Sequence, residues 1–501
     1  MDFLHITRVA CFTFLQAACS TLLALFIGLP LGFFCGRRNF PGRKFLLSLS
    51  AIPFCMPSLL IALGYVTFLG VNGHLNHFLM FAFGFKKPPV RILYSFAGLV
   101  IAHGFYNFPL IMKNLSSAWE RLPSESAESA RLLGAGEGRI FFTVTLSQLM
   151  PSIASSSLLV FIYSFLSFVL VLLFGGIGNS TLEVEIYKAA RASLDFKTLA
   201  ILACIETFIL ILVTVFYTVL EEKTSGLKWG SSEIWKARKP LKGFTEISSF
   251  FLIFLLIFVF FLAPLLGIVF NAFSQNRGMS GSGKIIFSLA AFKRILKMKT
   301  FWPSVISTVK TALLTGFFCT LLGFLYSVFL IFCERKEKSK FYIILKIIPM
   351  LPMAISSVVT GVIIIMIVKK GSAALLVVAQ TLLTWPLAWK VIYPHLSKIN
   401  KDTMDSGLLL SKNRLDMTFR LLLPFCLPAL LNAFGFCFAI SAGDTTLPLV
   451  LAIPKFETLS LFTYRLAGAY RFNEACAAGL VLALICGLVF VLSLGFRKKS
   501  D

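Results

Sequence analysis

The sequence predicts an all-α, polytopic membrane protein of about 11 transmembrane helices in two parallel repeats related by a pseudo-two-fold axis. The composition is the first indication, because 57% of the residues are hydrophobic and 14% are charged, whereas soluble proteins carry about 25% charged residues. The second is a series of apolar runs of about 20 residues, the length that crosses a bilayer. The third is an internal duplication of the chain.

About eleven apolar runs are each expected to form a membrane-spanning helix. Their approximate limits are 9–35, 45–69, 92–111, 148–174, 199–220, 250–269, 305–331, 342–368, 374–392, 427–451 and 475–494. The first run follows Arg8 and could resemble a secretory signal. Its length of roughly 25 residues exceeds the 7 to 15 of a signal core, so we expect it to stay in the protein as a helix.

Basic residues predict the orientation, because loops rich in Lys and Arg remain in the cytoplasm. The first run is followed by a basic loop with Arg37, Arg38, Arg43 and Lys44. A cytoplasmic position for this loop places the amino terminus outside and, after eleven crossings, the carboxyl terminus inside. The basic segment 271–303 is then left outside, as an exception. A surface helix there would explain its composition, with an apolar side of Ile286, Phe287, Leu289, Phe292 and Ile295.

The net charge of +25 does not by itself indicate nucleic acid, because the basic residues form short patches beside apolar runs, as in loops that face an anionic membrane surface. The 11 cysteines include no C-x-x-C pair, so neither a disulfide framework nor a metal site is indicated. We expect most of them to act as small packing residues.

The duplication is clearest in two polar segments, 122–151 and 399–428, which are related by an offset of 277 (122 to 399). This offset pairs Glu128 with Asp405, Ala130 with Gly407, Gly134 with Ser411, Pro109 with Pro386, and Thr181 with Thr458. Earlier in each half the offset is 295, which pairs Gly28 with Gly323. An even number of predicted spans separates the two segments, so both face the same side. The repeats are therefore parallel, since inverted repeats need an odd number.

The same pattern predicts the domain organisation. Residues 1–225 form the first transmembrane repeat, 226–247 a cytoplasmic linker, and 248–501 the second repeat. The linker is predicted from its polar composition, which is rich in Ser, Gly and Lys.

Two similar loops on one cytoplasmic face would form a docking surface for a dimeric partner. The pattern Glu128-Ser129-Ala130-x-x-x-Gly134 resembles the EAA loop of type I ABC importer permeases, which couples to ATPase subunits. The second loop carries Asp405, Gly407 and Ser411 at those positions. Other motifs resemble permeases with two halves in one chain, most of all those for thiamine and next those for ferric iron: 37–43, 102–109, 180–187 and 443–444.

The resemblance implies the type I ABC importer permease fold and a transport subunit that is not an enzyme. It also implies several partners: a cytoplasmic ABC ATPase dimer that binds ATP, an extracytoplasmic substrate-binding protein, and the bilayer of a bacterial inner membrane. No cofactor is expected in this chain. The family has six helices per half, whereas this chain begins where the second would begin, which leaves five plus six.

The expected substrate is thiamine or a thiamine phosphate, with ferric iron as the alternative. A different class, an ion-coupled secondary transporter, would use Asp444, Glu206 and His103 to carry protons. Asp444 takes the position that Ser167 has in the first half, and it is either a hydrogen-bonded acid between helices or part of a translocation path. Pro109 and Pro386 would kink the helices of such a path.

Residues 278–284 fit the spacing of a phosphate-binding loop as far as Lys284. Ile285 follows where Ser or Thr would bind magnesium, and no strand is expected before the segment. The sequence therefore favours a Gly/Ser-rich turn there.

Overall fold

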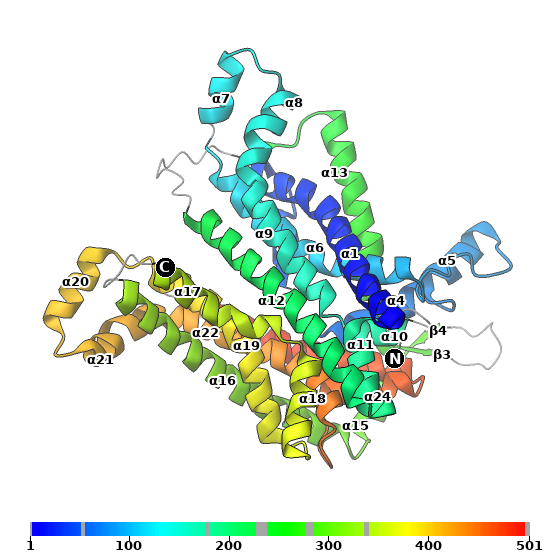
Figure 1. The fold of residues 1–501 in the computed structure, drawn as a ribbon. Helices are drawn as coiled ribbons and strands as arrows, with labels where there is room; N and C mark the ends of the chain where they lie inside the picture. The colour runs from blue at the N-terminus through cyan, green and yellow to red at the C-terminus, as the bar shows by residue number, and fades with distance from the viewer. Residues whose placement is uncertain are drawn as a thin grey trace. The chain divides into compact units, whose positions relative to one another are not determined.

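A computed structural model describes residues 3–51, 56–123, 125–175, 180–226, 238–276, 285–334 and 340–495. The described chain is mostly helical, and its strands form two short pairs (Figure 1). Strand β1 (Arg38–Asn39) is parallel to β2 (Lys239–Pro240), and β3 (Ser274–Asn276) is antiparallel to β4 (Ile285–Phe287). The predicted all-α membrane class is confirmed.

The chain divides into two compact units that interleave along the sequence. Unit 1 comprises residues 1–53, 64–185 and 204–267, and unit 2 comprises 54–63, 186–203 and 268–501. The domain limits predicted from the sequence, with a linker at 226–247, stay a prediction. Residues 227–237 of that linker lie outside the described residues.

The first part of the chain contains five long helices: α1 (Phe3–Arg37), α6 (Phe96–Arg121), α9 (Leu146–Phe165), α12 (Phe196–Gly226) and α13 (Phe244–Ile257). Shorter helices connect or extend them: α2 (Arg43–Ser48), η1 (Leu49–Ala51), α4 (Ser58–Leu69), α5 (His74–Phe83), α7 (Glu125–Leu132), α8 (Glu137–Ile140), η2 (Phe141–Thr145), α10 (Val169–Phe174), α11 (Leu182–Lys188), η3 (Ala189–Ser193), η4 (Phe258–Leu262) and α14 (Ala263–Ala272).

The second part has four long helices: α16 (Phe301–Glu334), α19 (Ala373–Leu396), α22 (Leu423–Gly443) and α25 (Phe472–Gly495). Its shorter helices are α15 (Ala290–Leu296), α17 (Lys340–Ile347), η5 (Ile348–Ala354), α18 (Ser357–Val368), α20 (Lys401–Leu410), α21 (Arg414–Met417), η6 (Thr418–Leu422), α23 (Thr446–Leu451) and α24 (Leu459–Gly468).

Within the described residues, 9 helices are long and apolar enough to cross a membrane, or up to 10 if one bent pair is a single span. That pair joins 344–354 to 357–368 at an angle of 79°, where the sequence predicted one continuous run. Pro349 and Pro352 lie in the bend, and proline removes a backbone donor and disrupts a helix. Helix α6 contains residues 96–111 of the predicted run 92–111 but is not among the 9.

Close packing in unit 1 depends on glycines at every fourth position of α1. A Cβ on each would lie less than 3 Å from a β-carbon of α6, in the pairs Gly28 with Ile111, Gly32 with Leu115, and Gly36 with Trp119. Glycine at this spacing lets two membrane helices approach closely. Unit 2 repeats the first of these contacts, since a Cβ on Gly323 of α16 would lie 3.1 Å from the Cβ of Ala388 of α19.

Equivalent hydrogen bonds support the predicted duplication. In unit 1 the Leu182 N–H donates to the Thr13 hydroxyl oxygen at 3.0 Å, and in unit 2 the Leu459 N–H donates to that of Thr308 at 2.7 Å. Thr13 and Thr308 differ by 295 positions, and Leu182 and Leu459 by 277. The π-helical turns η2 (141–145) and η6 (418–422) also differ by 277. The two halves therefore share backbone irregularities as well as residues.

The segment 271–303 differs from its prediction as a surface helix. Residues 285–287 form strand β4, and the helix α15 begins only at Ala290. The ring of Phe273 stacks on that of Phe287 with centroids 5.3 Å apart, while Ile295 is fully buried instead of facing outward. Residues 277–284, which include the turn that fits a phosphate-loop spacing, lie outside the described residues.

Candidate coupling loops and transport path

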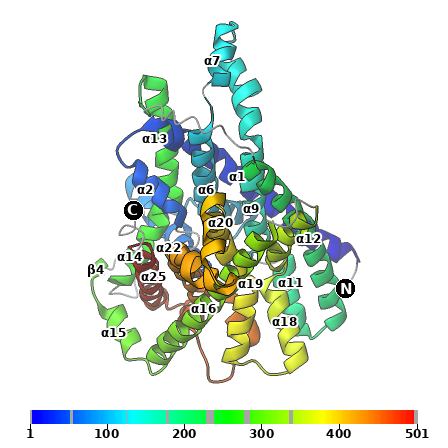
Figure 2. The same ribbon diagram turned by 90° about the vertical axis from the view of Figure 1, so that its left-hand side faces the viewer.

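The first candidate coupling loop consists of α7, a tight turn and α8. Helix α7 projects beyond the long helices of unit 1 (Figures 1 and 2), and none of its residues is buried. Glu125 and Glu128 lie in its first turn, where a carboxylate interacts favourably with the helix dipole. Its last residue, Leu132, and the following Leu133 are 90% and 88% exposed. The tip of this loop therefore exposes two apolar side chains at the end of an otherwise polar helix.

Gly134 ends α7 in a turn that requires a left-handed backbone, with φ at +80°. The Ala135 N–H donates to the Ala130 carbonyl at 3.0 Å, and the Gly134 N–H to that of Arg131 at 2.9 Å. This is the arrangement of a Schellman helix end, in which glycine avoids the steric cost of a side chain. No atom within 4 Å would contact a Cβ here, so the requirement for glycine comes from the backbone alone.

Arg131 and Glu137 connect the two sides of this turn. The guanidinium Nε lies 2.6 Å from one Glu137 carboxylate oxygen, and a terminal nitrogen lies 3.0 Å from the other. The Glu137 hydrogen bond raises the pKa of the exposed Arg131 guanidinium, which therefore stays charged. This two-point contact orients α7 on α8.

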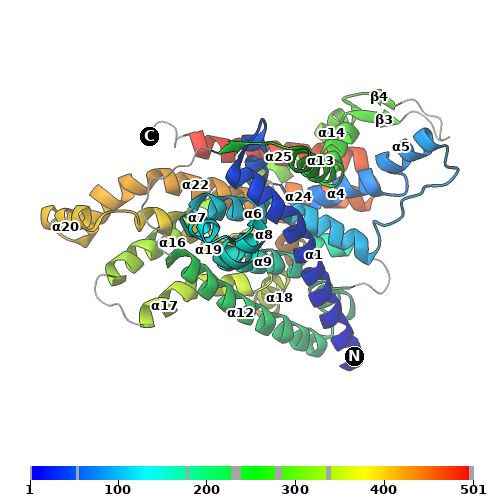
Figure 3. The same ribbon diagram turned by 90° about the horizontal axis from the view of Figure 1, so that it is seen from above.

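The second candidate coupling loop projects from unit 2 as α20 and α21 (Figures 1 and 3). Met404 of α20 is only 5% exposed and belongs to a core cluster with Met417 and Leu422. A Cβ on Gly407 would lie 2.6 Å from a methyl carbon of Leu421, so this position allows close packing of α20 on η6. Met404 therefore anchors α20 in the core of unit 2, whereas α7 has no buried residue.

Ser411 replaces the glycine turn with a different backbone. Its φ of −98° and ψ of 142° are extended, and the next helix starts after Asn413, whose side chain accepts from the Asp416 N–H at 2.7 Å. Despite this different turn, the leucines of the second loop are as exposed as those of the first. Leu409 and Leu410 are each 88% exposed, in the positions of Leu132 and Leu133. The two loops thus differ in their turns and share their apolar tips.

Asp444, the acid singled out for a transport path, follows α22 in unit 2. One carboxylate oxygen accepts from the N–H groups of Thr446 and Leu447 at 2.9 and 3.3 Å, and the other from the Gln380 side-chain amide at 3.0 Å. The Gln380 amide oxygen in turn accepts from the Ser441 hydroxyl at 2.6 Å. Asp444 therefore caps α23 and joins α22 to α19, and Gln380 is a partner that sequence reasoning did not identify.

The other residues singled out for a path lie in both units. Ser167 is 6% exposed and lies between α9 and α10, where its carbonyl accepts from the Thr181 hydroxyl at 3.5 Å. Pro109 is buried within α6, and Pro386 is buried within α19, six positions after Gln380. His103 of α6 is 2% exposed, and its Nε2 has no hydrogen-bond partner among the described residues. It takes the position of Gln380 in the first half. Glu206 of α12 is fully buried.

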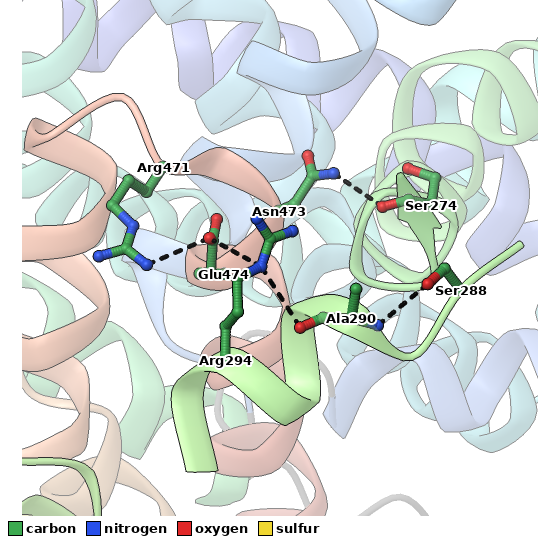
Figure 4. Close-up of polar contacts among 7 residues, drawn as sticks. All are labelled: Ser274, Ser288, Ala290, Arg294, Arg471, Asn473 and Glu474. Carbon is green, nitrogen blue, oxygen red and sulfur yellow. Dashed lines mark hydrogen bonds and ion pairs between the residues drawn. The ribbon is translucent and has the colours of Figure 1, made fainter. Parts of the chain in front are cut away.

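A polar cluster in unit 2 joins the β3–β4 hairpin and α15 to the start of α25 (Figure 4). The Glu474 carboxylate lies 3.4 Å from the Arg294 guanidinium and 3.2 Å from that of Arg471. The Asn473 side chain donates to the Ser274 carbonyl at 2.8 Å. These contacts hold the segment 285–296 against α25. The only sequence signal for Glu474 is its place just before the apolar run 475–494.

Comparison with known proteins agrees with these features. Residues 28–226 match the family of binding-protein-dependent transport system inner membrane components. The first half of this chain is therefore similar to the membrane components of binding-protein-dependent transport systems. The resemblance to permeases drawn from the sequence is confirmed.

Curated relatives extend the match over both halves. The thiamine transport system permease protein of Haemophilus influenzae is 25% identical over 99% of this chain and 90% of its own length. That of Escherichia coli is 24% identical over 97% and 88%. A solved bacterial ABC transporter for the acidic polysaccharide alginate covers 50% of this chain and 95% of its own, with 16% identity and a TM-score of 0.40. The sequence similarity to thiamine permeases therefore covers both halves of the chain.

Proposed function

We propose that this chain is a transmembrane subunit of a bacterial inner-membrane ABC importer and that it moves thiamine or a thiamine phosphate into the cell. The thiamine permeases that match nearly the whole chain support this choice of substrate. The general mode of action is supported by one observation above all. Two loops at equivalent positions each present a pair of leucines that are 88% to 90% exposed.

Exposed leucine pairs at the tips of short helices suit insertion into clefts of a partner, because burying them there removes apolar surface from water. The partner would be a cytoplasmic ATPase dimer, which binds the ATP. Glu128, Ala130 and Gly134 would form the first contact region, and Asp405, Gly407 and Ser411 the second. ATP-driven closure of the dimer would then move the two helical repeats through α7 and α20.

The transport path would use Asp444, Ser167, Pro109 and Pro386. Asp444 supports this role because it is a charged group among membrane helices, where such groups are costly and usually functional. Thiamine carries a positive charge, for which a carboxylate is a suitable partner. Three hydrogen bonds hold this carboxylate in place, so it needs little reorganisation when a cation passes.

The external partner would be a substrate-binding protein, and the polar cluster around Glu474 would hold the outer segment that receives it. The decisive test of the substrate is a binding measurement on the protein encoded beside this permease. Micromolar or tighter affinity for thiamine species supports the proposal. Iron binding with no response to thiamine would transfer the assignment to a ferric iron importer.

A second test concerns the mode of transport. The full-length chain is purified in mild detergent, and we expect an ABC ATPase to copurify and to hydrolyse ATP faster when the loaded binding protein is added. Uptake that follows a proton gradient without any ATPase would instead identify an ion-coupled transporter.

A further inference from the structure

A cleft of about 460 Å³ in unit 2 is not accounted for by coupling or transport. It is lined by the turn η3 and the start of α12 on one side and by the last two turns of α18 on the other. Its lining residues are Ala190, Arg191, Leu194, Phe196, Val362, Ile365, Met366 and Lys369. Six of them are apolar and two are cationic, and no acidic side chain is among them.

The cleft lies at the level where membrane spans end. Phe196 is the first residue of a span whose mean hydropathy is 2.7, and Lys369 directly follows Val368, the last residue of the bent span. Several of the apolar side chains here are exposed, among them Leu194 at 63% and Met366 at 48%. Exposed apolar side chains beside two cations are typical of the boundary between acyl chains and head groups.

Both sides of the cleft contact the same helix, α23. The Arg191 guanidinium donates to the Val450 carbonyl of α23, which fixes the η3 side. Gly361 lets α18 pack closely on the same helix, since a Cβ there would lie 2.7 Å from a methyl carbon of Val450. Both sides of the cleft are therefore attached to α23.

The adjacent acid, Asp195, keeps its negative charge but does not line the cleft. Its carboxylate accepts from the Thr198 N–H at 3.1 Å and from the Thr198 hydroxyl at 2.5 Å and so caps α12, which leaves two cations in the lining against one acid beside it. The backbone N–H of Lys369 donates to the Ile365 carbonyl at 2.8 Å, which ends α18 with Lys369 in a left-handed conformation. The local charge therefore favours an anion.

We propose that this cleft binds an anionic phospholipid, with the head-group phosphate between Arg191 and Lys369 and an acyl chain along Leu194, Phe196 and Met366. A phospholipid fits better than a free phosphate because the cleft is mostly apolar and much larger than one small ion. It fits better than an acidic protein segment because exposed apolar side chains of membrane spans flank it.

The test uses the full-length chain with its ATPase in nanodiscs that contain phosphatidylglycerol and phosphatidylcholine. A photoactivatable analogue of either lipid, with the reactive group on an acyl chain, is crosslinked and mapped by peptide mass spectrometry. We expect phosphatidylglycerol to label peptides that span 190–196 or 362–369, and phosphatidylcholine to label them several times less. Equal labelling by both lipids, or no labelling there, would overturn the proposal.

Charge-removing variants test the two cations. We expect Lys369→Asn to reduce phosphatidylglycerol labelling roughly fivefold, since a basic residue near an anionic surface contributes about 1 kcal/mol. Asn tolerates the left-handed backbone, so this variant should fold. The double variant with Arg191→Gln should reduce labelling further. Lys370→Asn is the matched control, because Lys370 is adjacent and does not line the cleft.

Other occupants give different outcomes. Displacement of the lipid by excess inorganic phosphate would show a phosphate site, and displacement by the binding protein would show a protein contact. Either result, or labelling unchanged in both charge variants, would contradict the proposal. Lipid labelling is measured without transport, so its result tests the lipid site independently of the proposed function.

Discussion

At the residue scale, Gly134 and Asp444 show how one position combines a structural with a proposed functional requirement. Gly134 is needed for its backbone conformation, because φ is +80° and the surrounding space is empty. Asp444 is needed for three hydrogen bonds within unit 2, whichever substrate passes. For Gly134, a substitution can separate the backbone conformation from the size of the side chain. For Asp444, a substitution can separate hydrogen bonding from charge.

Gly134→Val should abolish thiamine uptake while the protein still inserts in the membrane. A β-branched residue in the left-handed region costs at least roughly 1–2 kcal/mol, so the end of α7 would rearrange and misplace the leucine pair. Uptake of labelled thiamine and the amount of permease in membranes are measured together. Gly136→Val is the control, since Gly136 is equally open but has φ at −68°. Equal losses in the two variants would disprove the argument from conformation.

Ser411→Val should be milder than Gly134→Val, because Ser411 already has an extended backbone that valine favours. The same uptake assay compares the two. A loss of uptake in Ser411→Val as large as that in Gly134→Val would contradict this ranking of the two loops.

Asp444→Asn should lower uptake by about tenfold, the effect of losing about 1.4 kcal/mol of interaction with a cationic substrate. The amide oxygen can still cap α23, so the variant should reach normal membrane levels. Asp444→Ser introduces the residue found at the equivalent position, Ser167, and should lower uptake at least as far. Normal transport by Asp444→Asn would assign a purely structural role to this acid.

At the scale of elements, the two coupling loops reach similar tips by different means. Helix α7 has no buried residue and depends on its turn and on the Arg131–Glu137 contact. Helix α20 is anchored by Met404 in the core of unit 2. Each loop is followed by a π-helical turn, and such turns are frequent at functional sites in other proteins.

Replacing both tip leucines of α7 by glutamate, Leu132→Glu with Leu133→Glu, should reduce copurification of the ATPase. These side chains are already exposed, so the stability of the permease should change little, whereas burial in a partner cleft would be lost. Leu132→Met with Leu133→Met keeps the apolar surface and is the control. Full ATPase recovery with the glutamate pair would exclude the leucines from the contact.

At the scale of the whole molecule, the arrangement expected from the sequence has eleven crossings, the amino terminus outside and both coupling loops inside. The described residues contain 9 spans, or up to 10 with the bent pair. The helices that meet within each unit follow the duplication, since α1 packs on α6 through Gly28 and α16 packs on α19 through Gly323.

A reporter that is active only outside the membrane tests the orientation. Fusions at Gly281 should give signal, and fusions at Lys236 or after Asp501 should give none, because the basic loops are expected in the cytoplasm. Membrane abundance of each fusion is the control. The opposite pattern would place both coupling loops outside, where no ATPase could reach them.

Hydrophobic runs predicted the membrane class, and the 277-residue offset predicted the duplication. The importer family was predicted from the resemblance of the two acidic, small-residue loops to the EAA loop. These are periodic or local signals that a chain carries without long-range contacts. Tertiary structure alone decided that 342–368 bends, that 285–287 is a strand beside Phe273, and that Gln380 holds Asp444. It also brought Arg191 and Lys369 to one cleft. Those outcomes depend on which residues far apart in sequence pack together, and neither hydropathy nor spacing specifies that packing.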